Sequence, residues 1–187
     1  MTLHNLDAKY FRGSEENVLN RYYNAAKKFD IDPIVRITSD CPLIDPFVID
    51  EIINFYEKNQ YKMVTNAGPY EEKRTFPRGF DVEVFSFSLL EQAYENAEEN
   101  YQKEHVTPYI YENHDDKIHF YQNEKGDYSN LRLTVDTPED FKLIKKIYDN
   151  LYEGKHNFYS EEIIEFLNKN PELININKKV TQKNLND

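Results

Sequence analysis

Apolar side chains recur every three to four residues in several segments of the chain. This spacing runs from Val18 to Phe29 and again through residues 47–56, 87–98, 138–151 and 160–168. A stripe with this period lies on one face of a helix, so amphipathic helices are predicted in all five segments. Residues 101–111 form a further helical segment, in which Pro108 predicts a break because proline removes a backbone donor.

Short runs of β-branched and aromatic residues lie between the helical segments. They occupy residues 33–38, 61–66, 80–85, 117–122 and 131–135. Runs of this length and composition predict strands. Strands that alternate with helices favour an α/β fold, with a mostly parallel mixed sheet and helices on both faces. The change of strand direction is expected around residues 117–135.

Two of the helical segments carry local start signals. Asp45 precedes Pro46, and Thr137 precedes Pro138. An Asp or Thr side chain caps the free amides of a first helical turn, and proline suits the first helical position. Helices are therefore expected to begin at Pro46 and at Pro138.

Length and composition indicate a single folded unit. The chain has 187 residues, 39% of them hydrophobic, and its 15 Tyr and 12 Phe supply large side chains for a core. This size is ordinary for one domain. We predict one domain over residues 1–174, followed by a polar tail of residues 175–187 that is expected to be disordered.

The acidic balance and the cysteine content narrow the classes of function. A net charge of −11 opposes binding to nucleic acid or to anionic membrane surfaces. The sequence contains no apolar run near the ~20 residues of a membrane span, and its one cysteine, Cys41, gives no disulfide framework. We expect a cytoplasmic protein without membrane insertion, in which Cys41 is structural because no basic residue adjoins it.

Two aspartates directly follow predicted strands. Asp40 comes after the strand of residues 33–38, and Asp136 comes after that of residues 131–135. The carboxyl ends of strands border the ligand crevice of an open α/β sheet, and Mg²⁺ takes one or two protein carboxylates. An alternative role for Asp40 is to form the turn in which it lies. At the other site, helix initiation alone explains the residue types at 137–140, but it does not explain Asp136.

Four motifs in a fixed order carry a resemblance to a known family. They read RITSDCPLIDP at residues 36–46, FPRGFDVEVF at 76–85, EHVTPYIY at 104–111 and LRLTVDTPED at 131–140, and RGSEENVLNRY at 12–22 also matches. Together they resemble the spore coat polysaccharide biosynthesis (SpsF-type) branch of the acylneuraminate and deoxy-octulosonate cytidylyltransferase superfamily. The resemblance covers residues 8–150.

The resemblance implies a Rossmann-like nucleotide-diphospho-sugar transferase fold. It also implies transfer of CMP from CTP to an acidic sugar, nonulosonic or related, with release of pyrophosphate, in surface polysaccharide biosynthesis by a homodimer. Asp40 and Asp136 match the family's catalytic metal ligands, with Mg²⁺ as cofactor. The residues that match its substrate-binding segments are Arg12, Ser14, Glu15, Arg21, Arg78 and Asp81.

One family element has no counterpart in the sequence. Such enzymes begin with a strand and a basic, glycine-bearing loop that cradles the triphosphate, whereas residues 1–11 resemble the end of a later helix and the strand Lys9–Phe11. The expectation is an incomplete domain without the first strand and phosphate loop, which leaves activity open. Two alternatives stay open as well: a nucleotide-sugar-dependent glycosyltransferase of related fold, and a non-catalytic assembly module.

Overall fold

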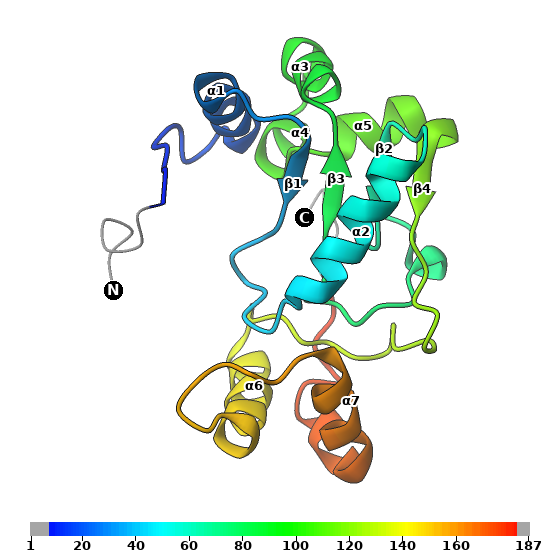
Figure 1. Ribbon diagram of the computed structural model, residues 1–187. Coiled ribbons are helices and arrows are strands. Elements are labelled where there is room, and N and C mark those ends of the chain that lie inside the picture. The colour runs from blue at the N-terminus through cyan, green and yellow to red at the C-terminus, as the bar shows by residue number, and fades with distance from the viewer. Residues whose placement is uncertain (1–7, 183–187) are drawn as a thin grey trace.

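Residues 8–182 are described by a computed structural model, in which one four-stranded sheet is flanked by helices (Figure 1). The strands are β1 (Ile34–Arg36), β2 (Met63–Thr65), β3 (Glu83–Phe85) and β4 (Ile118–Phe120). Their order across the sheet is β1-β3-β2-β4. Residues 1–7 lie outside the described residues, and with them lies the predicted helix end that precedes the strand Lys9–Phe11.

Three of the four strands run in the same direction. β2 pairs with β4 in parallel, whereas β3 is antiparallel to both of its neighbours, β1 and β2. The predicted α/β class with a mixed sheet is confirmed. The position predicted for the change of direction is wrong, because β3 is the reversed strand and β4 is parallel to β2.

The helices follow the predicted apolar stripes closely. They are α1 (Val18–Phe29), α2 (Pro46–Lys58), α3 (Phe87–Asn96), α4 (Asn100–His105), α5 (Pro108–His114), α6 (Pro138–Leu151) and α7 (Ser160–Lys169), with 3₁₀ turns η2 (Glu71–Lys73), η3 (Asp115–Lys117) and η4 (Pro171–Ile176). The break at Pro108 and both start signals are confirmed. Asp45 accepts a hydrogen bond from the Phe47 amide (2.8 Å), and Thr137 forms a capping box at the start of α6.

Side chains alternate between the two faces of the sheet and join two different cores. Val64 and Val84 pack with α2, α6 and α7, whereas Met63 and Phe85 pack with α1, α3 and α5. This is the two-residue period of a pleated strand. Figure 1 shows α2 across one face of the sheet, α1 and α3–α5 gathered at the other, and α6 and α7 beyond one end of the strands.

Two predicted strands are not strands in the structure. Lys9–Phe11 is irregular, and its side chains contact the last turn of α1 through Lys9 over the Phe29 ring and Lys28 over the Phe11 ring. Residues 131–135 form only one isolated parallel bridge, Arg78 with Arg132. The ladder stops there because the next free amide, that of Val135, donates to the Asp40 carbonyl in a loop (2.9 Å).

The C-terminal segment packs on the domain beyond the predicted boundary at residue 174. Asn177 is 3% exposed, and its side-chain amide donates to the Arg132 carbonyl (2.9 Å) and to the Asp140 carboxylate (2.8 Å). The prediction of disorder is therefore wrong at Asn177, because its side chain is held by buried hydrogen-bond partners. These partners lie far away in the chain, so the sequence alone does not indicate them. Residues 183–187 lie outside the described residues.

Gly79 lets two backbone segments approach closely. Its φ is +101°, and a Cβ atom there would lie 2.5 Å from the Leu133 carbonyl oxygen. Glycine is the residue that tolerates both the positive φ and the missing space. The approach allows two backbone hydrogen bonds: the Arg78 amide donates to the Leu131 carbonyl (2.9 Å), and the Arg78 carbonyl accepts from the Leu133 amide (2.7 Å).

Replacing Gly79 by alanine is expected to destabilise the fold through two separable effects. Backbone strain at positive φ costs about 1–3 kcal/mol. Gly154 also has a positive φ (+92°) but has nothing within 4 Å of a Cβ, so Gly154→Ala measures the strain alone. We expect Gly79→Ala to lower the free energy of unfolding by at least ~2 kcal/mol more than Gly154→Ala in urea titrations, because the clash adds overpacking. Equal losses would contradict the close approach.

Candidate functional site

Asp40 lies in the loop after β1 and bonds to the segment that leads to Asp136. The Thr134 hydroxyl donates to the Asp40 carboxylate (2.9 Å), and the Val135 amide donates to the Asp40 carbonyl (2.9 Å). Thr134 is 2% exposed and Asp40 is partly buried, so this contact is partly shielded from water. The structure thus brings together two loops that are almost a hundred residues apart in the sequence.

The environment of Asp40 favours its ionised form. Partial burial works toward a higher pKa, but hydrogen bonds from Thr38, Thr134, its own amide and the Cys41 thiol outweigh burial and lower the pKa of Asp40. Donors aimed at a carboxylate stabilise its charge. Burial also favours a higher pKa at the neighbouring thiol, where it prevails over the hydrogen bond from Thr38 and raises the pKa of Cys41 to about 12. Cys41 is therefore a protonated, buried residue and not a nucleophile.

Asp136 stands at the surface and is paired with an arginine. Its side chain is 43% exposed, and its carboxylate accepts from Nη2 of Arg132 (2.5 Å). The same guanidinium donates from Nε to Asp140 (2.9 Å). Asp136 therefore combines solvent access with a fixed partner on one side.

Asp140 is a fully buried carboxylate with a complete set of donors. It is 0% exposed and accepts from Arg132, Asn177 and the amides of Asp136 and Thr137. Burial opposes the charge, but the hydrogen bonds from Arg132 and Asn177 and the arginine's positive charge prevail and lower the pKa of Asp140. Asp140 is thus a structural anion that holds the start of α6 and the Arg132 side chain.

Two further predicted substrate-binding residues, Arg78 and Asp81, have acidic or basic partners of their own. Arg78 forms an ion pair with Glu71. The Asp81 carboxylate accepts hydrogen bonds from both terminal nitrogens of Arg74 (2.6 and 3.2 Å). Arg74 is buried, with 4% of its surface exposed. Such a two-point contact fixes the orientation of a carboxylate. Sequence reasoning missed Arg74, although its position seven residues before an aspartate in the same glycine-bearing loop was a usable cue.

The remaining predicted binding residues make local contacts before and within α1. The Ser14 hydroxyl accepts from the Asn17 amide, and the Ser14 carbonyl accepts from Arg21 (both 2.9 Å). Arg12 lies over the Tyr10 ring, and Glu15 is exposed. These contacts order the entry to α1 and do not join the four residues to Asp40 or Asp136.

A buried polar network that sequence reasoning missed lies where β1 ends and β3 begins. Glu83, 4% exposed, forms an ion pair with Arg36 and accepts from the hydroxyls of Thr107 (3.0 Å) and Tyr111 (2.7 Å). Burial, the charge of Glu83 and the hydrogen bond to it raise the pKa of Tyr111, so its hydroxyl stays protonated as a donor. Only the reversed strand brings Glu83 opposite Arg36 in the β1–β3 register.

Asn66 joins the two ends of the loop between β2 and β3. Its amide N–H donates to the Val82 carbonyl (3.3 Å), its side-chain nitrogen donates to the Phe80 carbonyl (2.7 Å), and its side-chain oxygen accepts from the Val82 amide (2.8 Å). Asn66 is 2% exposed. The loop that carries Arg74, Arg78 and Asp81 is therefore closed at its base by one side chain.

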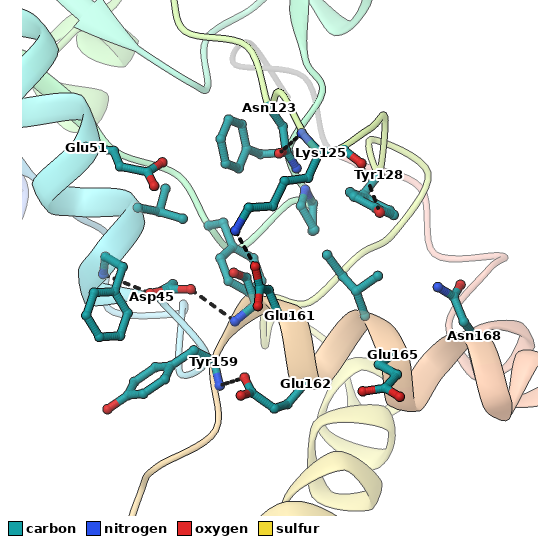
Figure 2. Close-up of a pocket in the computed structure, with 17 residues that line it drawn as sticks. Asp45, Glu51, Asn123, Lys125, Tyr128, Tyr159, Glu161, Glu162, Glu165 and Asn168 are labelled. Atoms are coloured by element: carbon teal, nitrogen blue, oxygen red, sulfur yellow. Dashed lines mark hydrogen bonds and ion pairs between the residues drawn. The ribbon is translucent and has the colours of Figure 1, made fainter.

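A cavity of about 570 Å³ between α2, α7 and residues 123–128 is lined by none of the predicted site residues (Figure 2). At its edge the buried Asp45 accepts from the Phe47 amide of α2 and from the Ser160 amide of α7 (3.0 Å), which ties the starts of the two helices together. Figure 2 shows Lys125 reaching toward Glu161, with which it forms an ion pair. The charges nearest this cavity are largely used in structural contacts.

A second cavity, of about 510 Å³, is lined by Arg78, Arg132 and Lys178. The two arginines are already paired with acidic residues, Arg78 with Glu71 and Arg132 with Asp136 and Asp140. These carboxylates offset most of the positive charge at the cavity wall. Of the predicted substrate-binding residues, Arg78 is the one that lines this cavity.

The donor chemistry of Asp40 and Asp136 fits Mg²⁺. Within residues 8–182 there is no cluster of three or more His, Cys, Asp or Glu side chains that could hold a metal ion, as a closed zinc site would require. Mg²⁺ needs fewer protein ligands, because waters and substrate phosphates complete its octahedron. Asp40, whose pKa is lowered, and the solvent-accessible Asp136 would be the two protein carboxylates that hold such an ion.

The mixed α/β fold is confirmed by its likeness to a solved structure. That structure, described as a cytidylyltransferase from Leptospira borgpetersenii serovar Hardjo-bovis, superposes with a TM-score of 0.83 at 37% identity, over 97% of this chain and 73% of the other. The chain belongs to the cytidylyltransferase family, whose sequence profile, described as Cytidylyltransferase, matches residues 4–174. The resemblance drawn from the motifs is confirmed.

Two curated relatives place the chain within this family more closely. An uncharacterized protein of Methanocaldococcus jannaschii is 43% identical over 184 residues, which is 95% of this chain and 70% of the relative. The spore coat polysaccharide biosynthesis protein SpsF of Bacillus subtilis is 34% identical over 170 residues, which is 88% of this chain and 66% of SpsF. The chain thus spans about two thirds of the length of these relatives. In the described part of the chain, every helix is too short or too polar to cross a membrane.

Asp140→Asn is expected to destabilise the protein in a pH-dependent way. Because the pKa of Asp140 is lowered in the folded state, its stabilising effect is complete above the unfolded value of about 3.9 and is lost as pH falls through the folded pKa. At pH 7 the variant should lose about 3 kcal/mol of unfolding free energy, since the largely buried Arg132 then keeps only the exposed Asp136 as a charged partner.

Urea titrations at pH 7 and near pH 2 measure this difference. It should shrink toward the lower pH, because the stabilisation from a carboxylate whose pKa is lowered on folding declines as pH falls below the unfolded value. The matched control is Asp149→Asn, which removes an exposed carboxylate paired with Lys145 and should cost less than ~1 kcal/mol. A pH-independent loss would contradict the assigned charge of Asp140.

Proposed function

We propose that the chain is the core of a sugar-activating cytidylyltransferase that transfers CMP from CTP to an acidic sugar. The observation that carries the proposal is the bonding of the Asp40 loop to Thr134 and Val135, which sets two aspartate-bearing loops side by side. Family membership supports the nucleotide, and the name of the SpsF relative supports a role in polysaccharide biosynthesis. The acidic sugar follows from the motif resemblance.

In the proposed reaction, the anomeric hydroxyl oxygen of the sugar attacks the α-phosphorus of CTP. The bond from that phosphorus to the bridging oxygen breaks, pyrophosphate leaves with the electron pair, and the hydroxyl proton is released. Such a transfer needs positioning and neutralisation of charge more than covalent participation by the protein. Asp40 and Asp136 would hold Mg²⁺, which when bound offsets the negative charge of the phosphates.

The chain's own residues have separable tasks in this reaction. Asp40 offers a carboxylate kept anionic by its hydrogen bonds, and Asp136 offers one that reaches solvent. Arg78 is placed in a cavity wall where a sugar carboxylate could displace Glu71 from its guanidinium. Asp81, held at two points by Arg74, is a rigid acceptor for sugar or ribose hydroxyls.

Asp40→Asn and Asp136→Asn are each expected to lower turnover by ~10²-fold or more, the size of the loss when one preorganised electrostatic group is removed. The assay follows CTP- and Mg²⁺-dependent release of pyrophosphate with a panel of nonulosonic and octulosonic acids. Asp149→Asn, an exposed aspartate on α6, is the control and should keep wild-type turnover. Full activity in both site variants would refute the assignment.

The same assay separates the competing functions. Turnover of a preformed nucleotide sugar, with no pyrophosphate released from CTP, would favour a glycosyltransferase. Calorimetric titration of CTP with Mg²⁺ that gives no binding heat would favour a non-catalytic assembly module. Homodimerisation and a cytoplasmic location stay predictions, which size-exclusion chromatography with light scattering and cell fractionation test directly.

A further inference from the structure

Arg132 sits between a solvent-accessible carboxylate and a buried one. Its Nη2 donates to Asp136 (2.5 Å) and to Asp140 (3.1 Å), its Nε donates to Asp140 (2.9 Å), and its Nη1 donates to Gln182 (2.6 Å). The Arg132 side chain is only 12% exposed, whereas that of Asp136 is 43% exposed. The guanidinium is thus fixed on its buried side and presents Nη2 to the exposed carboxylate.

The buried side of this arrangement is held from two directions. Asp140 lies within the first turn of α6 and accepts both guanidinium contacts in a two-point geometry. Asn177 comes from the segment after η4 and donates from one nitrogen to both the Asp140 carboxylate and the Arg132 carbonyl. Asn177 therefore holds together the two residues that set the position of the Arg132 side chain.

An exposed aspartate has several accessible rotamers, and only some of them point its carboxylate toward a neighbouring loop. A guanidinium held by two contacts to Asp140 and one to Gln182 presents its second Nη2–H in one direction. Pairing with Arg132 therefore removes rotamer freedom from Asp136. A preorganised ligand loses less entropy when it binds a cation, which is why partners of metal ligands affect affinity without touching the metal.

We infer that Arg132 is a positioning residue for Asp136. Asn177, from the C-terminal segment, acts with it as a clip, in the sense that its side chain bonds both Arg132 and Asp140 and keeps them in place. This inference rests on the proposed function, because it assigns Asp136 to cation binding. It extends the site to a segment of the chain that carries none of the family motifs. Residues after η4 would then determine how well the site binds its cation.

Two substitutions test positioning while the charges at the site stay the same. Arg132→Lys keeps a positive charge but loses the planar fork, so it cannot contact Asp140 at two points and Asp136 at once. Asn177→Ala leaves every charge in place and removes only the clip. We expect each to weaken binding of Mn²⁺ in the presence of CTP by about tenfold, the lower end for residues that orient metal ligands.

Asn175→Ala is the matched control for the clip. Asn175 has the same side chain and lies two residues earlier, and both asparagines line the cavity of about 510 Å³. Because Asn175 is exposed and is not part of the clip, its replacement should leave Mn²⁺ affinity unchanged. Affinity is measured by electron paramagnetic resonance of free Mn²⁺ at a temperature where denaturation curves show every variant to be folded. If Asn177→Ala does not fold, Arg132→Lys still decides the question.

The outcomes separate the inference from the proposed function. Wild-type affinity in both Arg132→Lys and Asn177→Ala, together with loss in Asp136→Asn, would overturn the positioning role and leave the proposed function intact. Unchanged affinity in Asp40→Asn and Asp136→Asn, or no Mn²⁺ binding by the wild-type chain, would overturn both. Weaker binding in the two test variants, with the control unchanged, supports the inference.

Discussion

The organisation of the candidate site depends on the hydrogen bonds between the Asp40 loop and the segment Thr134–Val135. They join the loop after the edge strand β1 to the residues just before α6, although residues 131–135 contribute only one isolated bridge. Thr134 is buried and Asp40 is partly buried, so the hydroxyl needs a partner here, because an unsatisfied buried group would be costly. This contact joins Thr38 in lowering the pKa of Asp40, and it places the Asp40 loop beside the residues that precede Asp136.

Helices were predictable from sequence because their information is local. The bounds of α1 and α6 match the apolar stripes at both ends, and the starts of α2 and α6 follow from Asp45 and Thr137, which cap amides within three residues of themselves. The reversed direction of β3 was not predictable in this way. Strand direction depends on which segments pair, and that choice is made between residues far apart in the chain.

The same distinction separates the contacts that the sequence could indicate from those that it could not. Asp40 and Asp136 follow short β-rich runs, so their neighbourhood could be inferred from the order of elements. The Glu83 network and the partners of Asn177 could not, because each consists of polar residues whose burial depends on long-range contacts. A polar residue in a sequence gives no sign of whether it will be solvated or enclosed.

The hydrogen bonds of Asn66 have a consequence for how this protein can vary. These hydrogen bonds hold residues 80–82 next to the end of β2. The two ends of the loop of residues 67–79 are therefore fixed close together. Insertions or deletions within such a loop need not shift the register of either strand, since both of its ends are fixed independently of its length. Differences in loop length among related chains are therefore expected within residues 67–75, before the family motif at residues 76–85, with Asn66 retained at the base of the loop.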